Sequence, residues 1–124
     1  MFALFHSLQL VTERLSISPF QECDLAAVYD MHRNADVNKY IPYSTWLNWH
    51  DAEQWLSMMH QRRIDKEAQI FSLKRKEDGV LIGTSLVFGA NKTVNDLNVG
   101  YVLSQSEWGK GYASEAMRGL SESL

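Results

Sequence analysis

Cysteine is nearly absent from this chain, since Cys23 is the only one among 124 residues. A single cysteine excludes an internal disulfide and a thiolate-based metal site. Histidine does not compensate, because His32, His50 and His60 lie at no spacing typical of metal ligands. We therefore expect no metal site, and we interpret these histidines as packing or surface residues. We interpret Cys23 as either a small buried apolar side chain or a bystander, and the low cysteine content suits a reducing compartment.

Long apolar runs and a strong excess of one charge are also missing. The net charge is −3, and the basic residues are too scattered to form a nucleic-acid surface. No run reaches the length of a membrane span, and residues 1–5 lack the basic flank of a signal peptide. We therefore expect a cytoplasmic protein with no direct nucleic-acid or membrane partner. Residues 1–124 are expected to form a single domain, with residues 1–10 as an extra strand, an exchanged arm or a tail.

What the chain does contain is a regular succession of strand and helix patterns. Residues 12–20 alternate polar and apolar side chains, as a half-buried strand does, and two stretches with helical spacing follow. The helical stripes are Leu25, Val28, Tyr29 and His32 in the first stretch and Ala52, Trp55, Leu56 and Met59 in the second. Three strands over 68–75, 80–88 and 97–103 and a helix from Gly109 complete the order β-α-α-β-β-β-α. This order predicts an α+β fold with a mostly antiparallel sheet and flanking helices.

The second helical stretch has recognisable ends. Asn48 or Asp51 is expected to open it, with Trp49 just outside the cap and able to pack back on the first turn. Arg62, Arg63 and Lys66 are interpreted as its solvated C-terminal end rather than as a binding patch. Within the third strand pattern, residues 80–88, Gly83 indicates a bulge or a close backbone contact.

The most informative stretch is the turn between the last strand and the last helix. Gly109 and Gly111 lie one residue apart there, and glycine lets backbone amides approach a ligand closely. The helix start adds unpaired N–H donors and the positive end of the helix dipole, a combination suited to phosphate. Lys110 adds positive charge. The alternative is a plain tight turn, because the motif is neither a Walker loop nor a dinucleotide fingerprint.

The sequence around these glycines resembles a motif of a known family. Gly100–Leu103 followed by Glu107–Ala116 resembles the acetyl-CoA-binding segment of the GNAT acetyltransferases, most closely the RimJ/RimL branch. The family loop reads Arg/Gln-x-x-Gly-x-Gly/Ala; here Trp108, Gly111 and Ala113 stand at its first, fourth and sixth positions. The resemblance covers roughly residues 11–124. Further segments that resemble the family in order are Thr12–Leu15, Pro19–Phe20 with Asp24, Asp36–Val37, Tyr40–Pro42, Ala52–Leu56 and Asp78–Gly83.

The resemblance implies a site for acetyl-CoA as co-substrate. The turn at 108–113 would take the pyrophosphate, strand 97–103 would pair with the pantetheine arm, and an amide near Val102 would polarise the thioester. The aromatic residues of 34–47, Tyr40, Tyr43 and Trp46, either cover the core or line the acceptor pocket. The cofactor-binding residues expected on this basis are Tyr101, Val102, Leu103, Trp108, Gly109, Lys110, Gly111, Tyr112 and Ala113.

The residue that deprotonates the acceptor amine is less clearly marked. Many family members carry a glutamate two residues before Gly100, but here that position is Asn98, which cannot take a proton. Glu107 and Asp96 are substitutes, although either can be a plain turn acid. The catalytic candidates are Glu107 and Asn98, and Glu115 is expected to stabilise its own helix. No nucleophilic serine or cysteine arrangement occurs, which favours direct attack by the amine.

The family domain normally continues beyond the last helix. The resemblance therefore implies a chain truncated at its C-terminus, which lacks the family's C-terminal strands and helix. Strand 97–103 would then be an apolar edge, so we expect a homo-oligomer, such as a dimer, to cover it. The expected function is acetyl transfer from acetyl-CoA to a primary amine, either a protein N-terminus or a small molecule. The alternatives are a non-catalytic remnant that binds CoA or a partner, and a phosphate-binding module unrelated to CoA.

Overall fold

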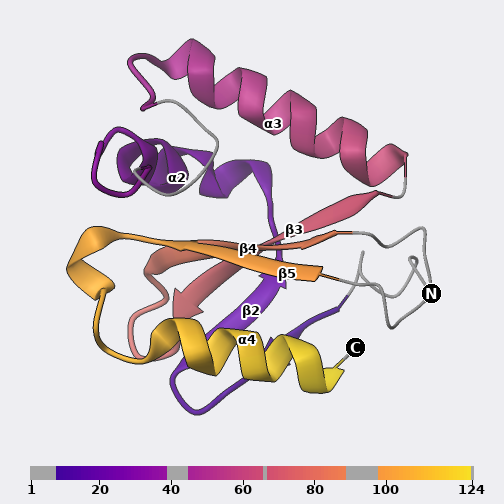
Figure 1. Cartoon of the computed structure of the whole chain (residues 1–124), viewed down its shortest axis with the longest axis vertical. Helices are drawn as coiled ribbons and strands as arrows, with labels where there is room; N and C mark the ends of the chain where they lie inside the picture. Colours follow the sequence, from indigo (N-terminus) through magenta and orange to yellow (C-terminus); the bar gives the residue numbers. More distant parts are fainter. Residues whose placement is uncertain (1–7, 39–44, 66, 89–97, 124) are drawn as a thin grey trace.

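A five-stranded antiparallel sheet forms the centre of the molecule, with strand order β1-β2-β3-β4-β5 (Figure 1). The computed structural model describes residues 8–38, 45–65, 67–88 and 98–123. The predicted order β-α-α-β-β-β-α and the α+β class are confirmed, with the short strand β1 added in front. The elements are β1 Leu10–Val11, β2 Leu15–Pro19, η1 Glu22–Asp24, α2 Leu25–His32, α3 Trp49–Ile64, β3 Ala68–Arg75, β4 Leu81–Phe88, β5 Asn98–Leu103, η3 Gln105–Glu107 and α4 Tyr112–Ser123.

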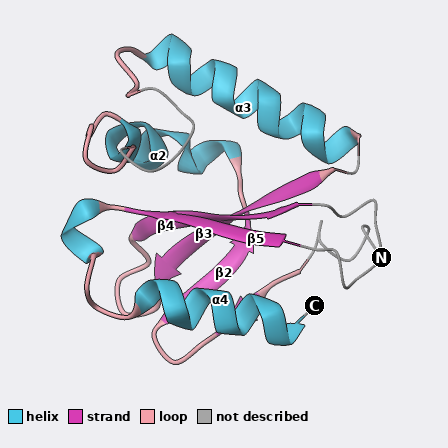
Figure 2. Cartoon of the chain, viewed as in Figure 1, coloured by secondary structure: helices cyan, strands magenta, loops and turns pink. Residues whose placement is uncertain are grey.

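The helices cover the two faces of this sheet unequally. Helices α2 and α3 lie over one face, and α4 alone lies over the other (Figure 2). Two apolar clusters result, one on each side. The α4-face core contains Leu15, Ile17, Phe71, Leu73, Ile82, Val87, Leu103, Ala116 and Leu120. The α2/α3-face core contains Leu25, Val28, Met31, Val37, Trp46, Ala52, Trp55 and Met59.

Helix α3 begins at Trp49, which the sequence interpretation places just outside the N-cap. The side chain of Asn48 accepts a hydrogen bond from the backbone N–H of Asp51 at 3.2 Å, so Asn48 is the N-cap. Trp49 is then the first helical residue, and its predicted place outside the cap is wrong. Its ring packs edge-on against Tyr29 of α2, with 5.3 Å between centroids, and so ties the two helices together.

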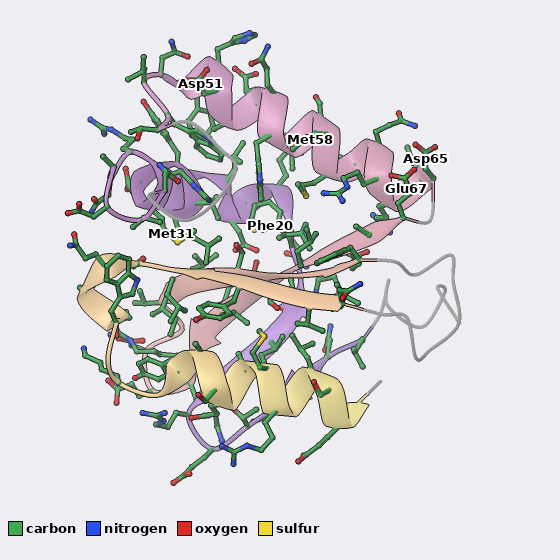
Figure 3. All side chains as sticks on the ribbon, viewed as in Figure 1. Phe20, Met31, Asp51, Met58, Asp65 and Glu67 are labelled. Atoms are coloured by element: carbon green, nitrogen blue, oxygen red, sulfur yellow. The ribbon has the colours of Figure 1, made fainter. Side chains whose placement is uncertain are left out.

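The α2 stripe also differs from the expected one. The helix buries Met31 together with Leu25, Val28 and His32, whereas Tyr29 is only half-buried. Helix α2 packs against both α3 and the sheet, so more than one side of it is covered. Phe20 and Met31 fill the space between this helix layer and the sheet (Figure 3).

Gly83 accounts for the close pairing of β4 with β5. The register shifts by one residue beside it, as Leu73 pairs with Gly83 but Lys74 pairs with Leu81. A Cβ on Gly83 would overlap the carbonyl oxygen of Val102. Both readings of this glycine, bulge and close backbone contact, are therefore confirmed.

Helix α4 starts at Tyr112, three residues after the predicted start. Gly109 and Gly111 have φ values of 76° and 82°, which lie outside the right-handed helical region, so the helix cannot extend back through them. Of the other sequence predictions, Tyr40, Tyr43, Lys66, Asp96 and residues 1–7 lie outside the described residues.

Candidate active site

The glycine turn exposes a set of backbone donors at the start of α4. Among the described residues, no acceptor is found for the amides of residues 109–113. The left-handed conformation of Gly109 and Gly111 shapes this turn, and the first turn of the twelve-residue helix α4 continues it. Such a set of amides at a helix N-terminus can bind a phosphate group.

A side-chain cluster holds this turn against the β1–β2 connection. The carboxylate of Glu115 accepts hydrogen bonds from the Thr12 hydroxyl and, at 2.7 Å each, from the backbone N–H and Nε of Arg14. Another guanidinium N–H of Arg14 donates to the carbonyl oxygen of Lys110 at 2.9 Å. The guanidinium also lies 4.3 Å from the ring centre of Tyr112. We call Thr12, Arg14 and Glu115 the Arg14–Glu115 brace, because it fixes both sides of the glycine turn.

The charge of Glu115 is stabilised by the same contacts. Burial would raise the pKa of this carboxyl, but the hydrogen bonds from Thr12 and Arg14 outweigh burial and hold the pKa below its ordinary value. Glu115 was expected to stabilise its own helix. It does lie in the first turn of α4, and it also connects that turn to the sheet.

Glu107 lies between two cations. It is buried, with its carboxylate 2.9 Å from the guanidinium of Arg75 and 3.2 Å from Nζ of Lys110. Arg75 also pairs with Asp78 in the β3–β4 turn at 2.8 Å. Both carboxylate oxygens of Glu107 are therefore occupied, which favours its role as a turn acid that holds Lys110 over a role as general base.

A cavity of about 480 Å³ opens between β5 and the glycine turn, and we call it the turn cavity. It brings together six of the nine residues expected to bind the cofactor. Lys110 and Gly111 belong to the same turn without lining the cavity, and the ring of Tyr112 packs beneath Arg14 instead. The lining residues are Val37, Tyr101, Val102, Leu103, Trp108, Gly109 and Ala113.

Trp108 is held in a defined position at the rim of the turn cavity. Its indole Nε1–H donates to the carbonyl oxygen of Leu103 at 3.1 Å, while 44% of the residue stays exposed. The ring therefore offers a fixed apolar surface beside the amide donors.

A second cavity of about 300 Å³ lies between α2, α3 and the sheet, and we call it the helix cavity. It shares Tyr101 and Val102 with the turn cavity, so both cavities border the middle of β5. The described residues that line it are His32, Trp55, Met59, Arg62, Ile70, Thr84, Leu86, Phe88, Gly100, Tyr101 and Val102.

His32 contributes a neutral ring to the helix cavity. It is buried and stacks on Trp46 with 4.4 Å between ring centres. The amide nitrogen of Asn38 donates to the carbonyl oxygens of His32 and Asn34, so the Asn38 oxygen, 2.7 Å from Nδ1 of His32, accepts a hydrogen bond from Nδ1–H. Burial lowers the pKa of His32, which keeps the ring uncharged near neutral pH. The packing role predicted for His32 is confirmed, and His50 and His60 are exposed.

Asn98 stands apart from both cavities. It is exposed at the start of β5 and pairs with Phe88 across the β4–β5 ladder. Gly100, two residues further along, lines the helix cavity. A catalytic role for Asn98 stays a prediction that no geometry of the described residues tests.

Three contributors to these sites carried little signal in the sequence. Arg14 was part of a recognised motif without an assigned role, and Val37 lay in an expected loop. Arg62 was interpreted as a solvated helix end, but the structure places it in the wall of the helix cavity. Helical spacing does point Arg62 to the same side as Trp55 and Met59, at i−7 and i−3, and this was the signal that could have identified it.

Two features are absent from the described residues. No helix there is long and apolar enough to cross a membrane. No group of three or more histidine, cysteine, aspartate or glutamate residues in that part of the chain could hold a metal ion.

The sequence profile of the acetyltransferase (GNAT) domain matches residues 14–123, which include Arg14 and Glu115 of the brace, both cavity walls and the glycine turn. The chain belongs to the GNAT acetyltransferase family. Its five-stranded antiparallel sheet with helices on both faces is the GNAT fold.

Relatives of this GNAT chain include two Bacillus proteins. The uncharacterized N-acetyltransferase p20 of Bacillus licheniformis is 28% identical over 111 residues, which cover 90% of this chain and 62% of p20. The uncharacterized N-acetyltransferase YnaD of Bacillus subtilis (strain 168) is 29% identical over 115 residues, which cover 93% of this chain and 64% of YnaD. The GNAT chain thus spans less than two thirds of the length of either relative.

Solved GNAT structures are similar over the same share. An acetyltransferase (GNAT family) from Bacillus anthracis has a TM-score of 0.73 at 25% identity, covering 91% of this chain and 63% of that one. RimL, a ribosomal α-N-protein acetyltransferase in complex with coenzyme A, has a TM-score of 0.76 at 14% identity, covering 92% and 65%. Spermidine N-acetyltransferase from Vibrio cholerae, in complex with CoA and spermine, has a TM-score of 0.69 at 15% identity, covering 88% and 63%.

Proposed function

We propose that this chain transfers an acetyl group from acetyl-CoA to a primary amine, a protein N-terminus or a small molecule, by direct attack of the amine. Membership of the GNAT family supports acetyl transfer in general. The observation that carries the specific proposal is that the turn cavity and the helix cavity are both lined by Tyr101 and Val102. A donor in the first cavity and an acceptor in the second would bring their reacting atoms together there.

The donor side uses the glycine turn and β5. The amides of residues 109–113 would take the pyrophosphate, and the fixed ring of Trp108 would cover the coenzyme beside them. Strand β5 is the last strand of the sheet, so its outer edge can pair with the amides of the pantetheine arm. That RimL and spermidine N-acetyltransferase were solved with coenzyme A supports the same donor here.

The acceptor side uses the helix cavity. An α-amine has a reference pKa of about 7.7–8.0, so a sizeable fraction is neutral near pH 7.5 and water can take the remaining proton. Glu107 is engaged by two cations, and Asn98 lies outside the cavity, so neither is needed in this scheme. The alternative is a non-catalytic chain that binds CoA or a partner.

The proposal extends to the RimJ/RimL branch, a cytoplasmic location and a homodimer. Among the described residues, β5 pairs only with β4, which leaves an edge that a second copy can cover. Size-exclusion chromatography with light scattering should show a dimer, and a clean monomer without aggregation would contradict the assembly.

A thermal shift titration with acetyl-CoA, followed by a free-thiol release assay with amine and peptide acceptors, tests the activity. We expect stabilisation and turnover. Stabilisation without turnover on any acceptor would select the alternative, and no stabilisation would remove the coenzyme from the proposal.

Two matched glycine variants connect this result to the turn. Gly109→Ala and Gly79→Ala both place a Cβ at a positive φ, 76° and 70°, with open space around it. Each should cost ~1 kcal/mol of stability. Only Gly109→Ala should weaken acetyl-CoA binding, because Gly79 lies in the β3–β4 turn. Equal binding by both variants would mean that the glycine turn does not hold the coenzyme.

A further inference from the structure

The wall of the helix cavity is mostly apolar, with polar groups on His32, Thr84 and Tyr101 and one formal charge among the described residues. Trp55 and Met59 are 95% buried on its helix side, and Ile70, Leu86 and Phe88 face it from the sheet. A volume of about 300 Å³ with such a lining suits the hydrocarbon body of a small molecule. Arg62 is the only charged residue among the described residues that line it.

Arg62 differs from the other partly buried arginines of the described chain. Arg14 pairs with Glu115 at 2.7 Å, and Arg75 pairs with Glu107 and Asp78. No described residue forms an ion pair or hydrogen bond with the guanidinium of Arg62, although Arg62 is half-buried. A cation beside an apolar cavity is stabilised by an anion that enters it, and guanidinium binds a carboxylate through two parallel hydrogen bonds.

We propose that the acceptor is a primary amine with an apolar body and a carboxylate at its other end, and that Arg62 recognises this carboxylate. This inference rests on the proposed acetyl transfer. Arg62 lies in the last turn of α3, on the helix wall, whereas Tyr101 and Val102 lie on the strand wall that borders both cavities. An acceptor that spans the cavity therefore presents its amine to β5 and its carboxylate to α3.

The same charge disfavours other amines. A polyamine would place a second ammonium near Arg62, and like charges repel more strongly in an apolar cavity than in water. The cation and the apolar wall also favour the neutral form of the reacting amine, because both lower the pKa of an ammonium group. Arg62 and the apolar wall thus both select the acceptor and favour the neutral, nucleophilic form of its amine.

Three amines of equal chain length test the proposal: hexylamine, aminohexanoate and hexanediamine, which end in a methyl, a carboxylate and a second ammonium. Acetylation rates with acetyl-CoA give kcat/KM, and NMR titrations of the full chain give Kd. We expect aminohexanoate to exceed hexylamine by about tenfold, since hydrogen bonds between charged groups are strong, and hexanediamine to be the poorest acceptor.

Arg62→Met should abolish the preference for aminohexanoate, so that within this variant its kcat/KM no longer exceeds that of hexylamine. Arg63→Met is the matched control, because Arg63 is the exposed neighbour on the same helix and does not line the cavity. Turnover with no preference, or a preference that survives Arg62→Met, would overturn the inference while the proposed function stands. If none of the three is acetylated while a peptide acceptor is, the inference fails and the proposed function stands. If no acceptor of either kind is acetylated, the proposed function fails, and the Kd ranking with its dependence on Arg62 still decides the recognition.

Discussion

The two faces of the sheet differ in how their side chains pack and in how their charges are paired. The α4 face is filled mostly by aliphatic side chains such as Leu73 and Leu120, with the ring of Phe71 among them, and it holds the glycine turn through paired charges. The α2/α3 face adds methionine and tryptophan to its aliphatic side chains, and it keeps a cavity and a cation without a described counter-ion. The α4 face therefore supplies stability and a fixed set of backbone amide donors, and the α2/α3 face leaves space for a ligand.

Leucine truncation on each face gives the largest expected contrast. Leu73→Ala removes a fully buried side chain from the α4-face core and should lower the free energy of unfolding by ~3 kcal/mol. Leu86→Ala, in the wall of the helix cavity, should cost about 1–2 kcal/mol, because that half-buried side chain already lacks contacts on one side. Urea unfolding measures both, and equal losses would show that the faces are packed alike.

Loss of the Arg14–Glu115 brace is the next largest effect. Glu115→Ala leaves the buried donors of Thr12 and Arg14 without their acceptor and should cost ~2 kcal/mol. Glu122→Ala, an exposed glutamate of the same helix, is the control and should change stability by less than about 0.5 kcal/mol.

The pH dependence of the brace follows from the lowered pKa of Glu115. Its contribution is fully present above the ordinary value of 4.5 and is lost as the pH falls through the lower folded-state pKa. In Glu115→Gln this part of the acid-induced loss should disappear. An unchanged acid profile in urea unfolding would contradict the role given to this carboxylate.

The α2/α3 face has its own pH dependence through His32. Because burial lowers the folded-state pKa below 6.5, the unfolded chain takes up a proton first, and stability falls as the pH drops below that value. The slope from one group cannot exceed roughly 1.4 kcal/mol per pH unit. Between pH 7.5 and 5.5, the free energy of unfolding should change less in His32→Asn than in the wild type. An equal change in both proteins would argue against a neutral buried ring.

The smallest expected effect concerns Gly100. A Cβ there meets no atom within 4 Å, so Gly100→Ala should change the free energy of unfolding by less than about 1 kcal/mol. Gly83→Ala, on the adjacent strand, would collide with Val102 and should cost about 1–3 kcal/mol. Thermal unfolding of both variants measures this difference. A large loss of stability in Gly100→Ala would show that the helix cavity leaves no space beside Gly100.

Much of this architecture could be predicted from local patterns. Alternation and helical spacing are properties of neighbouring residues, so they gave the order of elements and the α+β class. The glycine turn was predictable for the same reason, since its two positive φ angles depend on Gly109 and Gly111 themselves. The resemblance of the surrounding motif then pointed to the family.

The remaining features depend on distant contacts. The role of Arg14 exists only once α4 reaches the β1–β2 connection, and the cavity beside Arg62 exists only where α3 lies over β4 and β5. Glu107 looked like an available acid until the β3–β4 turn brought Arg75 to it. Side-chain chemistry in a sequence therefore shows what a residue can do, and the fold decides which of these possibilities it keeps.

The hydrogen bonds between Arg14 and Glu115 join residues 101 positions apart. Closing so long a loop is entropically costly, and contacts between neighbouring strands form before it. During synthesis, Arg14 cannot make these bonds until residue 115 has left the ribosome, so the glycine turn acquires its final shape only after the strands before it have been made. A chain with its sheet already assembled can thus still lack the final shape of this turn.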